Sequence, residues 1–486
     1  MYLFSVRYDY LLTEPEKKED IERTVELKTE RFTASLTMPY AGRFLLDPKD
    51  QSHQYFNVYQ NRMRQLRPVL VERINQMQKE KGTNHEVEER ILDIRMGVKS
   101  YVIGTIFKDM PLKPNVLREY SKEQAILLVP EKMNFVSPKD VLLLEDEAGR
   151  IKLVVDDSSM VAHHLTGTVV AVLGQQVGGG AFKVDGIWTP GFPNQSPRPS
   201  SSSLSSSSSS ATEQGPKYVA IVSGLNIGTP TFNPLFSSLL SDYLCGHLGS
   251  EDEQRSVATR VARTILAGNT FCSEEEVPAH SKLRDHTKSF SLLDQTRLDL
   301  VLKEVDTFVF SLCANMPVDI MPGSKDPSNY SMPQQPFNKC LFPRASQLTS
   351  LNYPTNPYSA VIDGVEFLGH SGQATQNIQN YITLQTGENV LDILEKTLEW
   401  RHIAPTAPDT LSAFPFKSHD PFVIDTCPHV YFVSEQDQFE AKRITGPQGQ
   451  TVQLVSIPAF NKTKTFVLVN LNTLDCHPVT LSTWDD

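Results

Sequence analysis

The sequence predicts an α/β protein in which a small all-β barrel precedes a larger α/β domain. Three observations predict this class: Val- and Ile-rich runs crowd residues 98–190, strand and helix patterns alternate after residue 216, and a Ser/Pro-rich stretch at 191–215 separates the two regions. A chain of 486 residues is also about three times the usual length of one domain, so several domains are expected.

The composition excludes several classes of protein. Apolar residues make up 39% of the chain, which is enough for packed cores and excludes global disorder. Because 57 acidic against 46 basic side chains give a net charge of −11, the chain as a whole is not expected to bind nucleic-acid phosphates or an anionic membrane. The six cysteines include no CxxC pair, and no run of about 18 apolar residues occurs, so a soluble intracellular protein without a metal ribbon is expected.

A helix is predicted from Ser52 to about Gln78, where apolar residues recur at spacings of three and four. Ser52 is expected to cap its start, and Pro68 to kink or break it. Acidic residues dominate the flanks of this helix, so its basic side chains are expected to be solvated rather than to contact nucleic acid. These side chains are Arg62, Arg64 and Arg67.

The strand patterns of residues 98–190 suit a small closed barrel such as an OB-fold. Residues 142–155 predict a hairpin, because two apolar strands flank a polar turn that contains Gly149. The strands carry few aromatic residues and have Asp and Glu at their turns, so a protein-binding barrel is favoured over one that binds single-stranded nucleic acid. The predicted domain comprises residues 35–190, with the helix included.

Two stretches are expected to be flexible. Residues 1–34 are charge-dense and weakly apolar, which indicates a flexible lead-in. Residues 191–215 form a Ser/Pro-rich loop that cannot bury enough apolar surface to offset the entropy of ordering it.

Residues 216–486 are predicted to form the α/β domain, because buried strands end in Gly-bearing loops that lead into helices. The functional loops of such a domain gather at the strand ends. The last two apolar runs, 451–460 and 464–472, are predicted to pair with each other as two β-strands.

Several blocks of the chain resemble, in order, the small (B) subunit family of DNA polymerase delta. They are residues 51–70, 317–343, 356–373 and 401–416, and the resemblance extends over roughly residues 35–480. It implies an OB-fold domain followed by a calcineurin-like phosphoesterase α/β domain, which is a relic in the eukaryotic replicative small subunits. The blocks TAPDTL and MPQQP favour the delta type, and the small subunits of polymerases alpha and epsilon remain alternatives.

The resemblance also implies a remnant of an ancestral two-metal site that is not expected to function. Asn269 stands where the superfamily has a bridging aspartate, Lys325 stands where it has a histidine, and Asp326 is retained. A lysine beside two dications would be strongly repelled, so a metal-dependent phosphodiesterase or nuclease is the less favoured alternative. The positions of this remnant site are Ser223, Leu225, Asn269, Lys325, Asp326, His370, Glu435 and Asp437.

The function that the resemblance implies is that of a scaffold without catalytic residues, metal or cofactor. Its expected partners are the C-terminal, metal-binding domain of the polymerase catalytic subunit and a third, accessory subunit on the OB side. The accessory subunit would connect the assembly to the sliding clamp, and DNA would be reached only through the complex. The expected location is the nucleus, and the expected processes are DNA replication and repair.

Overall fold

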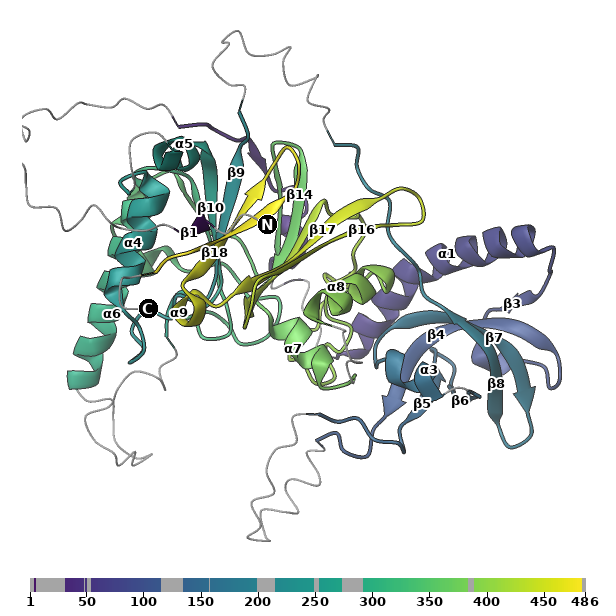
Figure 1. Cartoon of the computed structure of the whole chain (residues 1–486). Helices are drawn as coiled ribbons and strands as arrows, with labels where there is room; N and C mark the ends of the chain where they lie inside the picture. Colours follow the sequence, from purple (N-terminus) through teal and green to yellow (C-terminus); the bar gives the residue numbers. More distant parts are fainter. Residues whose placement is uncertain are drawn as a thin grey trace, which may run out of the picture.

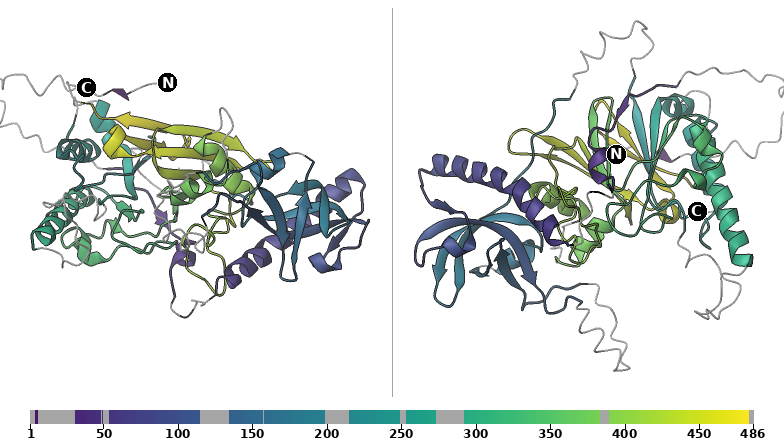
Figure 2. Two further views of the ribbon diagram at one scale, coloured as in Figure 1. Left: turned by 90° about the horizontal axis from the view of Figure 1, so that it is seen from below. Right: turned by 180° about the vertical axis from the view of Figure 1, so that it is seen from behind.

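Three groups of β-strands organise the described part of the chain, shown as a computed structural model in Figure 1. The residues described are 4–5, 31–47, 49, 54–114, 134–156, 158–198, 215–248, 253–272, 292–382 and 389–482. Within them, two sheets form a sandwich, built mostly from residues after 215 with two short strands from the N-terminal region, and a third group of strands forms a separate lobe with the first long helix (Figure 2).

The first sheet of the sandwich has a parallel centre, as the alternating strand and helix patterns predict. Its order is β1 (Phe4–Ser5), β19 (Cys476–Thr480), β18 (Thr465–Asn470), β9 (Tyr218–Val222), β10 (Val261–Ala267), β11 (Val318–Met321) and β12 (Leu351–Asn352). The second sheet has the order β16 (Glu440–Thr445), β17 (Thr451–Pro458), β15 (Val430–Gln436), β14 (Val365–His370), β13 (Tyr358–Ile362) and β2 (Leu36–Thr37).

The two sheets face each other across one apolar core. Along β9, Val219 and Ile221 point into this core, while Ala220 and Val222 belong to a second core under the helices. The inner core also contains Phe367 and Phe432 of the second sheet. Alternation of this kind follows from the two-residue period of a strand and explains why nearly every residue of the central strands is apolar.

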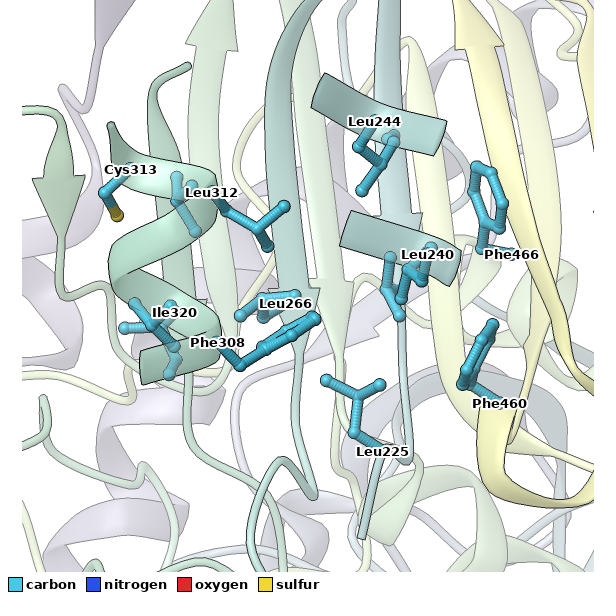
Figure 3. Close-up of a cluster of buried hydrophobic side chains, with 14 of the residues drawn as sticks. Leu225, Leu240, Leu244, Leu266, Phe308, Leu312, Cys313, Ile320, Phe460 and Phe466 are labelled. Carbon is cyan, nitrogen blue, oxygen red and sulfur yellow. The ribbon is translucent and has the colours of Figure 1, made fainter. Parts of the chain in front are cut away.

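Helices cover the outer faces of both sheets. The first sheet is covered by α4 (Pro234–Cys245), α5 (Glu253–Arg260) and α6 (Leu292–Cys313), and the second by α7 (Gln373–Gln379) and α8 (Val390–Glu399). Figure 3 shows Leu240 of α4 and Phe308 of α6 directed at the same strands. Asn233 caps α4 by accepting a hydrogen bond from the backbone of Leu235, and Asn389 and Asp392 form a capping box on α8.

The strands of residues 99–188 pair in a ring. β4 (Lys99–Asp109) pairs with β5 (Val141–Glu145), β5 with β6 (Arg150–Val154), β6 with β8 (Ala181–Trp188), β8 with β7 (Val169–Val177), and β7 with β4 again. Only the β6–β8 pair is parallel among these strands of the described chain. The predicted hairpin at 142–155 is confirmed as β5 and β6. We call this ring of strands the barrel.

The first long helix, α1 (Phe56–Lys81), runs through Pro68 without a break, contrary to the break considered from the sequence. Its apolar face, with Leu66, Leu70 and Ile74, packs on β4 and β7, and this packing offsets the roughly 3 kcal/mol that an internal proline costs a helix. Tyr55 precedes its first turn without a side-chain cap, and the predicted cap Ser52 lies outside the described residues.

The predicted pairing of the last two apolar runs is wrong. β17 lies in the second sheet between β16 and β15, and β18 lies in the first sheet between β19 and β9. The short helix α9 (Phe460–Thr463) carries the chain from one sheet to the other. Each strand is buried on both faces and takes its neighbours from other parts of the chain, which a linear pattern does not reveal.

Parts of the stretches expected to be flexible are bound to the sandwich. Arg31 donates hydrogen bonds to the carbonyl oxygens of Leu244 and Val261, at 2.9 Å each. Gln195 donates to the carbonyl oxygens of Pro428 and Thr451, so the start of the Ser/Pro-rich loop is also held. Residues 1–3, 6–30 and 199–214 of these predicted stretches lie outside the described residues.

The remaining elements of the described residues are short. They are η1 (Ala41–Phe44), β3 (Glu86–Glu88), η3 (Ile91–Asp93), α3 (Ser158–His163), η5 (Lys339–Leu341) and η6 (Ala345–Gln347). No helix among the described residues is both long enough and apolar enough to cross a bilayer.

Candidate functional site

The loops after β9, β10, β11, β14 and β15 meet at one edge of the sandwich, around a polar cavity of about 540 Å³. Four positions of the remnant site line this cavity: Asn269, Lys325, Glu435 and Asp437. Much of the remaining lining is amide and hydroxyl, contributed by Ser324, Ser371, Gln373, Gln376, Asn389 and Gln436. The other four positions of the remnant site do not line it.

Asp326, the retained carboxylate, holds the loops together. Its Oδ2 accepts hydrogen bonds from the backbone N–H groups of Asn269 and Gly323, both at 2.7 Å, and its Oδ1 accepts one from Phe271 at 2.8 Å. The side chain is buried, and burial raises its pKa to about 7 in spite of these three donors. Both oxygens are therefore used by backbone groups of the β10 and β11 loops.

Asn269 takes part in the same loop contact. Its φ of 54° lies in the left-handed region, and its Oδ1 accepts a hydrogen bond of 2.9 Å from the backbone of Lys325. A Cβ at Gly323 would lie 2.4 Å from this Oδ1, so only glycine allows the two loops to approach this closely. The amide serves as a loop connector in the position where the resemblance implies a bridging carboxylate.

Ser223 and Leu225 turn away from the cavity. The Oγ of Ser223 accepts a hydrogen bond of 2.9 Å from the backbone of Glu435, which ties the β9 loop to the β15 loop. Leu225 is buried in the apolar core under α4 and α6, and Figure 3 shows it beside Phe460 of α9. An apolar side chain thus occupies the position that the resemblance assigns to an imidazole ligand.

His370 is buried at the end of β14, and both of its ring nitrogens have partners. Its Nδ1 accepts a hydrogen bond of 3.1 Å from the backbone of Gly372, so Nε2 carries the proton and donates it to Thr375 Oγ1 at 3.2 Å. Burial lowers its pKa to about 4, which keeps the ring neutral at physiological pH.

Glu435 and Asp437 differ in their surroundings. Burial raises the pKa of Glu435, although the nearby amides of Asn269 and Asn226 and the charge of Lys325 act in the opposite direction. Asp437 is exposed and pairs with Lys462 at 3.2 Å. Both carboxylates therefore have a lysine nearby: Lys325 acts on Glu435, and Lys462 pairs with Asp437.

This arrangement differs from what two-metal chemistry requires. Two cations need several carboxylates and imidazoles that converge on the same point. Within the described residues, no group of three or more His, Cys, Asp or Glu side chains is arranged to hold a metal ion. The residues present do not fit a pair of divalent cations.

A buried network around Arg62 corrects the prediction that this arginine is solvated. Arg62 is fully buried, and its Nε lies 2.7 Å from Asp420 Oδ2. The same Oδ2 accepts a hydrogen bond of 2.9 Å from His402 Nε2. The guanidinium also donates to three carbonyl oxygens, those of Gly167, Pro405 and Ala407.

The charges of this network shift the pKa of each partner. Burial alone would raise the pKa of Asp420, but Arg62 and His402 hold it well below its usual range. Burial and the neighbouring Arg62 lower the pKa of His402 to about 4. A sequence signal did exist, because Arg62 lies four residues after Val58 and four before Leu66, on the apolar face of the helix.

Other contacts join the barrel to the sandwich at the same junction. The buried Lys108 of β4 donates a hydrogen bond of 3.0 Å to the carbonyl oxygen of Tyr381, and Lys113 pairs with Asp409. An apolar cluster spans the junction, and it includes Met110, Phe135, Leu165, Ile378, Tyr381 and Trp400. The two lobes therefore share both a polar and an apolar interface.

Comparisons with known proteins give a consistent result. Residues 219–441 match the DNA polymerase alpha/epsilon B-subunit family, and residues 54–187 match the DNA polymerase delta subunit OB-fold domain. The chain is 39% identical to a DNA polymerase delta small subunit of Arabidopsis thaliana, over 89% of this chain and 92% of the relative. It is 37% identical to the one of Oryza sativa subsp. japonica (90% and 94%), and 32% identical to DNA polymerase delta subunit 2 of Drosophila melanogaster (90% and 96%).

Proposed function

Because the chain belongs to the family of DNA polymerase delta small subunits, we propose that it is a non-catalytic scaffold of the polymerase delta complex. It binds the C-terminal, metal-binding domain of the catalytic subunit and, on the barrel side, a third accessory subunit. The accessory subunit links the assembly to the sliding clamp. The complex acts in DNA replication and repair in the nucleus, and the chain reaches DNA only through it.

The sandwich is proposed to be a calcineurin-like phosphoesterase domain whose metal site is degenerate, and the barrel to be the OB-fold. The observation that carries the degeneracy is the position of Asp326, whose two oxygens accept three backbone hydrogen bonds. These bonds occupy about three of the four lone-pair positions of the carboxylate, and the side chain does not line the cavity, so little capacity is left for a metal ion. Leu225 in the apolar core and Lys325 at the cavity support the same conclusion.

The junction supports the scaffold role. Arg62, Lys108 and the apolar cluster fix the barrel to the sandwich, so the two lobes present one continuous surface. A permanent complex commonly buries more than about 2,000 Å², and a rigid surface loses little entropy on binding. The net charge of −11 suits a subunit that binds proteins and leaves DNA to its partners.

The test is co-expression of the full chain with the delta catalytic subunit, followed by affinity purification and measurement of the mass of the complex. The catalytic subunits of polymerases alpha and epsilon serve as matched competitors. The proposal expects a one-to-one complex with the delta chain that survives moderate salt. Recovery of the chain alone, or a preference for the alpha or epsilon chain, would contradict it.

A further inference from the structure

A second cavity, of about 600 Å³, lies beside the segment that leaves the barrel after β8. Residues 194–198, at the start of the Ser/Pro-rich loop, form one wall of this cavity. The remaining lining residues are His429, Arg443, Gln448, Gly449, Gln450, Thr451, Thr473 and Leu474. Among the described residues, two arginines line the cavity, Arg198 and Arg443, and no acidic side chain does. We call it the loop-start cavity.

The chain is fixed to the sandwich where it enters the loop-start cavity. Gln195 exchanges two hydrogen bonds with the backbone of Thr451: its Nε2 donates to the carbonyl oxygen at 2.8 Å, and its Oε1 accepts from the N–H at 2.9 Å. His429 Nδ1 accepts a hydrogen bond from the backbone of Glu366, so Nε2 carries the proton and donates it to the carbonyl oxygen of Ser196 at 3.1 Å. These contacts place Ser196 at a defined point of the cavity wall.

Ser196 offers an accessible hydroxyl in front of a proline. The serine is half-buried, and the two residues that follow it, Pro197 and Arg198, are exposed. Among the described residues, no hydrogen bond uses the Ser196 hydroxyl. Proline-directed protein kinases transfer a phosphoryl group to a serine or threonine in this position, and they need the proline to be accessible. Ser196 meets both requirements.

The other serines and threonines that precede a proline differ from Ser196. They are residues 137, 189 and 229. The hydroxyl of Ser137 accepts a hydrogen bond from a backbone N–H group, and the hydroxyl of Thr229 donates one to a backbone carbonyl oxygen. Pro190, which follows Thr189, is buried. Ser196 therefore combines the unused hydroxyl with the exposed proline.

The loop-start cavity presents cations to a phosphate on Ser196, which would carry about −1.5 to −2 charges at pH 7. Arg198 has no ion pair within the described part of the chain, and its charge adds to the effect of burial in lowering the pKa of His429. Arg443 lies 3.0 Å from Asp475, but both side chains of this pair are about half exposed, so the pair is weak. Arginines bind phosphate through two parallel N–H groups, which suits both side chains to this role.

We propose that Ser196 is a phosphorylation site and that Arg198 and Arg443 bind its phosphate in the loop-start cavity. A proline-directed kinase supplies the phosphoryl group from ATP. The bond between the γ-phosphorus and the bridging oxygen breaks, a bond from the γ-phosphorus to Ser196 Oγ forms, ADP leaves, and the hydroxyl proton passes to a base of the kinase. The bound phosphate then fastens the start of the Ser/Pro-rich loop to the second sheet. This inference goes beyond the proposed scaffold function and does not depend on it.

The first test incubates the full chain with magnesium ATP and a cyclin-dependent kinase as the probe of the proline-directed class. Mass spectrometry of the peptides should locate a phosphate on Ser196, and the Ser196→Ala variant should lose it. The matched control, Ser137→Ala, removes the other serine that precedes a proline and should leave the phosphate on Ser196 in place. An unmodified Ser196 in the chain would overturn the proposal, whichever other residue the kinase modifies.

The second test measures whether the arginines bind the phosphate, by phosphorus NMR of the phosphorylated chain across a pH titration. Nearby cations favour the dianion, so the second pKa of the phosphate, about 6 without them, should fall by about half a unit or more relative to the same protein unfolded in urea. Arg443→Gln should reduce this shift. Lys442→Gln is the control, because neighbouring residues of β16 point to opposite faces and Lys442 pairs with Asp392 and Glu395. Equal pKa values in the folded and unfolded chain, or a shift that Arg443→Gln leaves unchanged, would overturn the binding of the phosphate in the cavity.

Discussion

Asp326 is the residue that holds the loops of the candidate site together. Its carboxylate lies after strand β11, and its oxygens accept the N–H groups of Asn269, Phe271 and Gly323. Buried backbone donors are costly to leave unpaired, so the residue is needed for the loops even where no metal is bound.

Replacing Asp326 with asparagine should destabilise the chain by about 1–3 kcal/mol, because an amide presents a donor to backbone donors. Urea unfolding measures this free energy. The control is Asp437→Asn, at a side chain that is 92% exposed, and its effect should stay within about 0.5 kcal/mol. Equal stability of the Asp326 variant and the unmodified chain would show that the three hydrogen bonds do not stabilise the loops.

His370 should make stability fall on acidification. Its pKa of about 4 lies below the value of about 6.5 for an unfolded chain, so below pH 6.5 the unfolded state takes up a proton that the folded state does not. The loss is up to about 1.4 kcal/mol per pH unit between pH 6.5 and about 4. The free energy of unfolding of a His370→Asn variant, measured across this range, should depend less on pH than that of the unmodified chain.

The amide in His370→Asn still accepts the hydrogen bond from Gly372, so the comparison isolates the titration. Parallel pH profiles of the two proteins would contradict the assignment of a neutral, buried imidazole.

For single residues, the sequence shows which side chain stands at each loop position, but it does not show what that side chain contacts. That Leu225 stands where the resemblance implies a ligand is visible in the sequence alone, because the loop motif sets the position. The burial of Arg62 could not be predicted from the motif, because its partners Asp420 and Pro405 are more than 300 residues away along the chain.

Among the elements, α1 contributes most to joining the two lobes. Its apolar face packs on the barrel through Leu66 and Leu70, while Arg62 extends from the same face into the sandwich. One helix therefore contacts both lobes, and its position determines how they fit together.

Replacing Arg62 with methionine should destabilise the chain by about 3–5 kcal/mol, because Asp420 would remain as a buried carboxylate without its main cation. The matched control is Arg64→Met on the exposed side of the same helix, which should change stability by less than about 0.5 kcal/mol. Thermal and urea unfolding of both variants give the comparison. A small effect at Arg62 would mean that Asp420 is compensated by His402 alone.

The strand pairings show what a local sequence pattern can and cannot predict. The hairpin of β5 and β6 was predicted correctly, because both strands and their turn are adjacent in the sequence. The pairing of β17 and β18 was predicted wrongly, because each strand has neighbours that are distant in sequence. Local patterns determine which segments are strands, but the packing of the whole sandwich determines their partners.

The whole molecule is expected to unfold as one unit. Lys108, Lys113 and the apolar cluster join the barrel to the sandwich, and a Cβ at Gly167 would lie 1.8 Å from the carbonyl oxygen of Pro405. This close approach leaves no space for a side chain at residue 167. Neither lobe should therefore lose its structure independently.

Tryptophan fluorescence can test this cooperativity, because Trp188 lies in the barrel and Trp400 follows α8, on the sandwich side of the junction. Variants that keep either Trp188 or Trp400, with the third tryptophan of the sequence, Trp484, replaced in both, should show the same urea midpoint. Gly167→Ala should separate the two midpoints, since its methyl group forces the junction apart. Different midpoints in the unmodified junction would show that the lobes are independent domains.

The central claim is that the loops of the sandwich serve the architecture of a polymerase subunit and no longer hold a pair of metal ions. Calorimetric titration of Mn²⁺ into the purified full chain tests it most directly. The predicted result is no saturable binding, with the same trace for Asp326→Ala once folding has been checked. Saturable binding of two ions per chain, lost in that variant, would contradict the claim.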